Sequence, residues 1–412
     1  MMHPKMRYIY CGIDTHKRTH TATVINCWSE KLGELTFENR PGAFNDFLKE
    51  VKSYAGKGIT PVFGLEDTGG VGRSLAVFLI KHKQIVKNVD STLTYSERRN
   101  QSIIHKTDSY DSECVARVLL NRFDSLKDAS PQDIYYTLSM LVKRRVAIVK
   151  ASTALKNQVH NYISQHYPSY KKFFHVFDCK TALAFWEKYP SPSKLKGVDS
   201  ETLGKFLASQ SGNFFSAKKA TEILELVKKD GDTETEFQSS RDLIVETCIK
   251  ELKHNREDIK KIEAEMQNLM DRIGQKLETM IGLDLVSAAS IIAEVGDISR
   301  FQSAPSLAKY AGIAPITYAS GDKTHTFKNR YGNRTLYQLF HNLAARQINK
   351  GRNKDKPVNP LFLQYYEKKI AQGKTKHQAT VAVMRRLVNI VYGMLKNKAE
   401  YVHPVLSKEK AE

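Results

Sequence analysis

The chain has 412 residues, of which 41% are hydrophobic and 26% charged, a balance that excludes a disordered protein and allows two or three folded domains. Its formal net charge of +20 indicates a polyanionic partner, and nucleic acid fits better than an acidic membrane because no lipidation signal or basic amphipathic anchor is present. Five cysteines without Cys-x-x-Cys spacing, no secretion signal before Tyr8 and no apolar run of membrane-spanning length predict a cytoplasmic protein without a structural zinc.

The first predicted element is a buried strand that begins at Tyr8 and carries Asp14 near its end. Two further stretches, residues 19–27 and 31–38, alternate in polarity and predict the rest of an antiparallel sheet. A carboxylate on a core strand costs free energy unless it is paired, hydrogen-bonded or bound to a cation. We therefore expect Asp14 on the central strand of a mixed sheet, facing a site at the rim of that sheet.

A second carboxylate, Glu66, ends the short apolar strand predicted over residues 61–66. Helices are predicted at 41–54 and 71–82, and another strand at 84–89. Antiparallel strands followed by alternating strands and helices are typical of an RNase-H-like layered fold. A dinucleotide-binding fold is disfavoured, because no Gly-x-Gly-x-x-Gly follows the first strand.

The segment of residues 106–117 is predicted to open a helix that continues to about residue 122, and the three-residue spacing of Asp108 and Asp111 places both on one helix face. With Asp14 and Glu66 they form a set of hard oxygen donors of the kind that binds Mg²⁺ or Mn²⁺. Each alone is more often a helix cap or a solvated side chain. The four together predict a metal site for phosphoryl transfer.

Long helices dominate the middle of the chain. Residues 137–167 predict an amphipathic helix whose polar side includes Arg144 and Arg145, candidates for phosphate contact. Residues 171–232 are lysine-rich and predicted to be helical and peripheral. Residues 245–273 repeat apolar side chains at 3-4 spacing around one asparagine, which predicts a coiled-coil seam and self-association. The alternative is a helix that packs within its own chain.

The last region is the most basic, with seventeen Lys and Arg against four Asp and Glu from residue 320 to residue 400. Its predicted helices cover residues 286–295, 336–348, 361–372 and 375–396. A strand-like run precedes Ser320, and Ser-Gly at such a place is usually a turn. The surrounding cations favour a second interpretation, a serine nucleophile beside a bound phosphate. These candidate nucleic-acid contacts are Lys323, Lys328, Arg330 and Arg334.

Two residues near Ser320 could also take part in the chemistry. Tyr318 is a rival hydroxyl, and His325 is a candidate base or phosphate contact that could also be merely exposed.

Several blocks of the sequence resemble, in order, those of one protein family. The N-terminal blocks are Gly12-Ile-Asp-Thr-His-Lys17, Gly64-Leu-Glu-Asp-Thr-Gly69 and Thr107-Asp-Ser-Tyr-Asp111. The C-terminal blocks are Ala293-Glu-Val-Gly-Asp297 with Arg300-Phe301, Tyr310-Ala-Gly-Ile-Ala-Pro315, Ser320-Gly321, and Lys328 with Gly332-Asn333. They resemble the DEDD transposases of the insertion-sequence-110 family, to which the Piv-type DNA invertases are related.

The resemblance implies a RuvC-like nuclease fold with Asp14, Glu66, Asp108 and Asp111 as an acidic tetrad, and Ser320 as the serine of a second active-site element. It also implies recombination of donor and target DNA, guidance by a structured RNA made from the end of the element, and action as a homo-oligomer, a dimer or tetramer. Ile281 and Asp284 depart from the Pro-Gly-Ile-Gly turn usual in the family.

We therefore predict an α/β plus all-α chain. The expected domains are an RNase H/RuvC-like domain at 5–125, a helical linker and peripheral insertion at 126–236, a coiled-coil helix at 237–278 and a helical C-terminal transposase domain at 279–402. The expected function is that of a transposase or site-specific recombinase, bound to the nucleoid and to no membrane, that forms a phosphoserine intermediate.

Two other functions remain open. A structure-selective endonuclease would use metal-activated water and leave hydrolysed ends without attached protein. A non-catalytic nucleic-acid-binding protein would show no Mg²⁺-dependent strand cleavage.

Overall fold

The computed structural model describes residues 3–100, 107–129, 133–320, 323–327, 329, 331–351 and 357–402. For Asn100, Asp133, Ala319, Ser320, Lys323 and Thr324 it describes the backbone alone. The chain divides into two compact units, unit 1 (residues 1–136) and unit 2 (residues 137–412).

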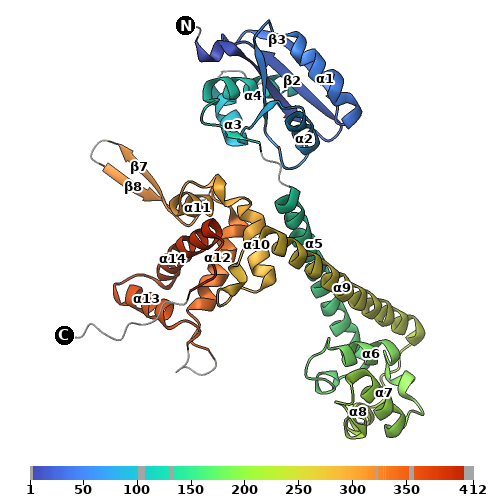
Figure 1. Ribbon diagram of the computed structural model, residues 1–412. Helices are drawn as coiled ribbons and strands as arrows, with labels where there is room; N and C mark the ends of the chain where they lie inside the picture. Colours follow the sequence, from blue (N-terminus) through green and yellow to red (C-terminus); the bar gives the residue numbers. More distant parts are fainter. Residues whose placement is uncertain are drawn as a thin grey trace, which may run out of the picture. The chain divides into compact units, whose positions relative to one another are not determined.

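Unit 1 is built on a mixed sheet, two strands of which, β2 and β3, are labelled in Figure 1. The sheet has six strands in the order β3-β2-β1-β4-β5-β6. The strands are β1 (Tyr8–Thr15), β2 (Thr19–Ile25), β3 (Lys31–Glu38), β4 (Thr60–Leu65), β5 (Ile85–Asn88) and β6 (Lys127–Asp128). The pairs β1–β2, β2–β3 and β5–β6 are antiparallel, whereas β1–β4 and β4–β5 are parallel. The strand that carries Asp14 therefore lies inside the sheet, between β2 and β4, as its apolar sequence predicts.

Both faces of this sheet are covered by helices. Alternate residues of β1 point to opposite faces, so the strand contributes side chains to a core on each side. Ile9, Cys11 and Ile13 join a core with α1 (Pro41–Ser53) and α2 (Arg73–Lys81). Tyr10 joins a second core with α4 (Asp108–Arg122). A further helix, α3 (Ser91–Asn100), packs on α4 and was not expected from the sequence.

Gly12 explains how closely α4 approaches the sheet. A Cβ at this position would lie 2.1 Å from the backbone nitrogen of Ala116. No side chain larger than hydrogen fits between strand and helix, so Gly12 allows α4 to lie directly on β1. This contact fixes the first turn of α4 near the end of β1.

Unit 2 contains most of α5 (Asp133–His166) and, after it, the helices α6 (Lys180–Lys188), α7 (Ser200–Ser211), α8 (Ala217–Asp230) and α9 (Gln238–Ile273). An aromatic core that includes Phe173, Phe185 and Trp186 holds α6, α7 and α8 against the end of α5 and the start of α9. The lysine-rich segment of residues 171–232 therefore packs around a hydrophobic core.

The heptad-patterned residues form one continuous helix, α9, whose apolar seam is used within unit 2 at both ends. Val245 and Leu252 belong to the aromatic core, Met266 and Ile273 near the other end are buried, and α9 also packs on α10. Asn255, in the middle, is half-buried and its Nδ2 has no hydrogen-bond partner among the described residues. Packing within the chain, the alternative interpretation of the heptads, therefore holds for the two ends of the seam.

The remaining helices of unit 2 are α10 (Leu285–Val295), α11 (Ala304–Tyr310), α12 (Arg334–Gln347), α13 (Pro360–Ala371) and α14 (Lys376–Asn397). The sequence predicts four of them with ends within two residues of those observed. A hairpin of β7 (Ile316–Ser320) and β8 (Lys323–Phe327) follows α11 and projects away from the helices of unit 2 (Figure 1). The short 3₁₀ helices are η1 (Pro4–Arg7), η2 (Tyr170–Lys172), η3 (Pro192–Leu195), η4 (Leu277–Thr279) and η5 (Ile298–Arg300). Within the described ranges, no helix combines the length and apolar character that crossing a membrane requires.

Candidate metal centre and serine hairpin

Two of the predicted carboxylates lie at one edge of the sheet of unit 1. Asp14 is the last residue but one of β1, and its side chain is only 16% exposed. Glu66 directly follows β4, which runs parallel to β1. The carboxyl ends of the two strands therefore reach the same edge, and each delivers one carboxylate there.

The other two carboxylates come from the first turn of α4. Thr107 caps this helix by accepting a hydrogen bond from the backbone nitrogen of Tyr110 at 3.2 Å. Asp108 is the first helical residue and is 62% exposed, whereas the side chain of Asp111 is 9% exposed. The close approach of α4 to Gly12 brings this turn to the end of β1.

The four carboxylates are close enough to affect one another's charge. Burial raises the pKa of Asp14 above its usual value. His16 lowers this pKa, whereas the negative charges of Asp111, Glu66 and Asp108 raise it further. The net rise means that the charged form of Asp14 is disfavoured in the bare protein. A cation at this edge would relieve the repulsion.

His16 belongs to this site although sequence reasoning did not select it. Its Nε2 lies 3.2 Å from Oδ2 of Asp14 and 3.4 Å from Oδ1 of Asp108. Asp14, His16 and Asp108 each offer one ligand atom, and these atoms lie within 4.8 Å of one another. A usable signal was present, since residues two apart at the end of a strand share one face.

The donor set fits a hard divalent cation. Carboxylate oxygens suit Mg²⁺ and Mn²⁺, and an imidazole is tolerated by first-row transition ions. The repulsion that raises the pKa of Asp14 supports this fit, and the buried Oδ1 of Asp111 already has positive charge beside it, since the guanidinium of Arg98 lies 2.8 Å away. The sequence expectation of a site for Mg²⁺ or Mn²⁺ is therefore compatible with the side chains present.

Helix α3 supplies two further residues that sequence reasoning missed. Thr94 donates a hydrogen bond from Oγ1 to Oε1 of Glu66. Arg98, one helical turn later, places Nη2 2.8 Å from Oδ1 of Asp111 without making a hydrogen bond to it. The two contacts lie four residues apart, so one face of α3 reaches two of the four carboxylates. Arg98 supplies positive charge at a site that otherwise holds like charges.

Ser320 lies in unit 2, at the end of β7, where its backbone pairs with that of Lys323. Neither side chain is described. Lys328 and Arg330 lie outside the described residues. Tyr318, the rival hydroxyl, is 61% exposed, packs edge-on against Phe327 and pairs across the hairpin with His325.

Arg334 begins α12 beside a cleft of about 410 Å³. Asn333 caps the helix and also donates a hydrogen bond to Glu294 at 2.7 Å. Gly312 and Gly332 form the narrow wall of the cleft, since a Cβ on Gly332 would lie 2.2 Å from Cα of Gly312. The exposed guanidinium of Arg334 is free to reach a phosphate at this helix N-terminus.

The remaining predicted contacts differ from one another. Arg144 is exposed on α5, whereas Nε of Arg145 lies 2.7 Å from Oε1 of Glu263 on α9 and is held within unit 2. Asp284, which departs from the family turn, is the N-cap of α10 and accepts a hydrogen bond from the backbone nitrogen of Ser287 at 2.7 Å. Its carboxylate takes the place that a phosphate would need there.

Two family models match the chain. Residues 11–168 match a DEDD transposase model of the IS110 type, and residues 274–366 match a model described as transposase of the IS116/IS110/IS902 family. The first match contains the acidic cluster, and the second contains Ser320 and Arg334.

Curated relatives are similar to the chain over different shares of its length. An insertion element IS110 uncharacterized 43.6 kDa protein from Streptomyces coelicolor is 25% identical over 304 residues, 72% of this chain and 72% of that protein. An insertion element IS900 uncharacterized 42 kDa protein from Mycobacterium paratuberculosis is 23% identical over 407 residues, 96% of this chain and 97% of its own length. A pilin gene-inverting protein from Moraxella bovis is 30% identical over 127 residues, which are 30% of this chain and 37% of that protein.

Proposed function

We propose that this insertion-sequence transposase is a recombinase that cuts and rejoins DNA through a phosphoserine link at Ser320. The proposal starts from the match of the chain to transposase domains of the IS110 family. The observation that carries the proposal is the gathering of Asp14, Glu66, Asp108 and Asp111 at one sheet edge. Such a cluster suits a divalent cation that binds phosphates.

The N-terminal domain is proposed to be RuvC-like. Support comes from the order of the first five strands, β3-β2-β1-β4-β5, with an antiparallel start and parallel continuation. Support also comes from the position of the acidic residues, two at strand ends and two on the helix that lies on β1.

The acidic residues are proposed to hold Mg²⁺ or Mn²⁺, with His16 as an additional ligand or as a hydrogen-bond partner of Asp14. When bound, the cation neutralises charge on the attacked phosphate. The carboxylates fix its position, and Arg98 balances the charge of Asp111. Burial of Asp111 excludes water from one side of the site.

Ser320 is proposed as the nucleophile. Its Oγ forms an ester bond to phosphorus while one ester bond of the DNA strand breaks, and the strand that leaves takes the proton as a free hydroxyl. One ester replaces another, so rejoining needs no high-energy cofactor. Lys323, Lys328, Arg330 and Arg334 would hold the phosphate oxygens in the transition state. The acidic cluster and Ser320 act on one phosphate, from one chain or from two.

The proposal includes partners beyond DNA. Guidance by a structured RNA rests on the family resemblance and on the basic excess after residue 320. Self-association through α9 rests on the half-buried middle of its seam, around Asn255. Sedimentation of the full chain measures the latter, and a monomer at high concentration would contradict it.

A recombination assay tests the proposed function. The substrate is a supercoiled plasmid that carries the gene with its native flanking DNA, incubated with the protein, its flanking transcript and Mg²⁺. We expect rejoined products, and we expect none with Asp14→Asn. Asp46→Asn is the matched control, since Asp46 is exposed on α1 and pairs only with Lys49 among the described residues. Hydrolysed, unjoined ends from the wild type would favour a nuclease instead.

A further inference from the structure

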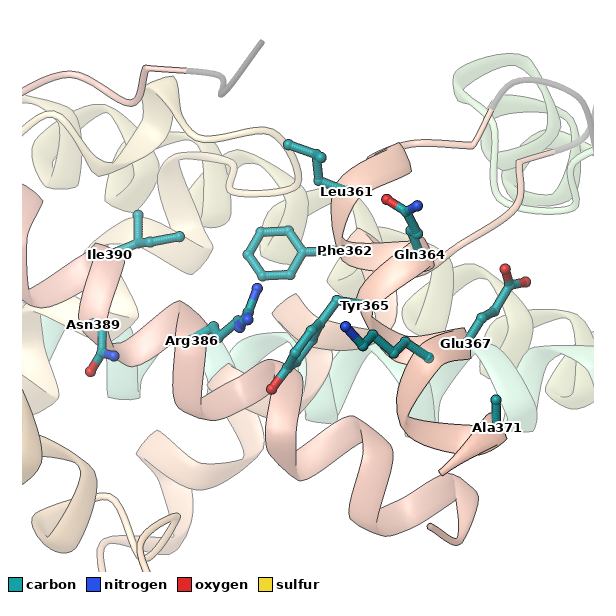
Figure 2. A pocket seen from close by; sticks show the side chains of 10 residues that line it. Leu361, Phe362, Gln364, Tyr365, Glu367, Ala371, Arg386, Asn389 and Ile390 are labelled. Atoms are coloured by element: carbon teal, nitrogen blue, oxygen red, sulfur yellow. The ribbon is translucent and has the colours of Figure 1, made fainter. Parts of the chain in front are cut away.

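A groove between α13 and α14 is lined, among the described residues, by none of the acidic cluster or of the serine hairpin. It has a volume of about 980 Å³, and Figure 2 shows the side chains that line it. Leu361, Phe362 and Ile390 give it apolar walls, and Phe362 is buried. Tyr365 and Arg386 lie beside each other, below Phe362 in this view (Figure 2).

Tyr365 and Arg386 form a stacked pair. Cζ of Arg386 lies 3.5 Å from the centre of the Tyr365 ring, the separation of two flat groups in van der Waals contact. Nζ of Lys369 lies 5.4 Å from the same ring centre. Arg386 is exposed and lines the groove, so a ligand in the groove can reach its side chain. An open guanidinium face on an aromatic ring is a platform on which another flat group can stack.

The rim of the groove carries polar side chains suited to a nucleotide. Gln364 and Asn389 line it, and side-chain amides pair with the donor and acceptor groups on base edges. Lys368 supplies a cation for a phosphate. Glu367 is the one acid among the described lining residues, and Lys350 neutralises it at 2.9 Å. The lining therefore combines apolar, stacking, hydrogen-bonding and cationic groups.

We propose that this groove binds an unpaired base of the DNA strand that is being exchanged, stacked on Arg386 and Tyr365. The inference rests on the proposed recombinase function, because strand exchange releases bases from their duplex. A base that leaves the duplex loses its stabilising stacking interactions, and stacking on a protein side chain can replace them. Apolar walls favour a base over the sugar-phosphate backbone. A paired duplex keeps its bases stacked inside and cannot offer one to the groove.

The affinity of the full-length protein for two DNA probes tests this inference. One probe is a fluorescent duplex, and the other is the same duplex with three unpaired bases at its centre. We expect the wild type to bind the probe with unpaired bases about tenfold more tightly, within the range that stacking on a protein side chain supplies. Fluorescence anisotropy measures both dissociation constants.

Three variants separate stacking from charge. Arg386→Lys keeps the charge but loses the flat surface, and Tyr365→Ala removes the ring beneath it. Both are expected to bind paired duplex as the wild type does and to lose the tenfold preference. Lys374→Ala is the matched control, an exposed cation in the loop between α13 and α14 that does not line the groove, and it should keep the preference.

Other outcomes are decisive as well. A preference that survives in Arg386→Lys and Tyr365→Ala overturns the groove as its source, whatever the activity of the protein. A preference for unpaired bases in an RNA duplex but not in a DNA duplex, lost in both variants, overturns the assignment to DNA. A wild type that binds neither DNA probe overturns this inference and the proposed function together.

Discussion

Asp14 stands one residue from the end of a buried strand, where burial and three neighbouring carboxylates raise its pKa. Such an arrangement costs folding free energy in the bare protein and is understandable if a cation binds there. His16 and Arg98 contribute positive or neutral groups to the same cluster. At the scale of residues, the structure therefore connects the acidic cluster to metal binding and predicts how two single substitutions act.

Asp14→Ala should remove the stabilisation that Mg²⁺ gives to the wild type. A ligand that binds only the native state stabilises it by about 2.7 kcal/mol at one hundred times its dissociation constant. Without Mg²⁺, Asp14→Ala should be as stable as the wild type or more stable, because a like charge is gone. Thermal unfolding with and without Mg²⁺ measures both effects. Asp46→Ala is the control, and an equal Mg²⁺ response in Asp14→Ala would count against a shared metal site.

Arg98→Ala should have two opposite effects. It leaves the carboxylate of Asp111 buried without its cation, which should lower the stability of the metal-free protein by about 1–3 kcal/mol. It should also enlarge the stabilisation by Mg²⁺, because the ion no longer competes with the guanidinium. Calorimetry with and without Mg²⁺ measures the two terms. Arg99→Ala removes the same charge from the exposed side of α3 and should change neither.

The helices and strands show what the sequence can and cannot predict. β1 and α4 could be predicted, because β1 is a continuous run of mostly apolar residues and Thr107 and Asp108 mark the start of α4. α3 could not, since Ser91–Asn100 has no apolar period and only Thr94 is buried in it among the described side chains. Its position depends on contacts with Glu66 and Asp111, which are distant in sequence. Thr94 and Arg98 were missed for the same reason.

Asp178 links two long helices of unit 2, and this link should depend on pH. Burial alone would raise the pKa of Asp178, but Lys156 of α5 and Arg256 of α9 lower it below its usual value. A carboxylate with a lowered native pKa adds stability above its unfolded pKa, and this stability is lost as pH falls through the native pKa. Asp178→Asn should therefore cost about 1 kcal/mol at neutral pH, and this cost should shrink below the usual Asp pKa of 3.8 and become small below the lowered native pKa.

Denaturant unfolding followed by tryptophan fluorescence measures this difference. Trp186 lies in the aromatic core and donates a hydrogen bond to the backbone oxygen of Phe177, the residue before Asp178. The other tryptophan, Trp28, is exposed in unit 1. A loss of stability in Asp178→Asn that is the same in acid as at neutral pH would show that the charge is not responsible.

At the level of the whole molecule, the main feature predicted from the sequence is its charge, and the structure shows which elements carry it. The basic excess after residue 320 is shared by the hairpin, by α12, α13 and α14 and by the sequence between them, and the acidic cluster lies in unit 1. The catalytic pairing of these regions remains a proposal, since the acidic cluster and Ser320 belong to different units. The sequence predicts acidic metal ligands in one region and a serine with basic neighbours in the other. Whether both act on one phosphate is a matter for experiment.

DNA binding should weaken steeply with salt. Each phosphate contact releases counterions and contributes a slope of about −0.9 to the plot of log affinity against log salt. Arg334→Ala should make the slope shallower by about one contact. Lys205→Ala is the control, because Lys205 pairs with Glu201 on α7, far along the chain from the basic region. Anisotropy titrations at several salt concentrations measure the slopes, and an affinity that hardly changes with salt would contradict the prediction.

Trapping of a covalent adduct tests the central claim most directly. A DNA substrate with a nick beside the cleavage site lets the released strand diffuse away, so a protein joined to the other end cannot rejoin it. Incubated with Mg²⁺, the wild type should give a denaturation-resistant protein–DNA adduct whose DNA-bearing peptide contains Ser320. Ser320→Ala should bind the same DNA equally well and give no adduct. An adduct at Tyr318, or cleavage by Ser320→Ala with no adduct in the wild type, would contradict the account.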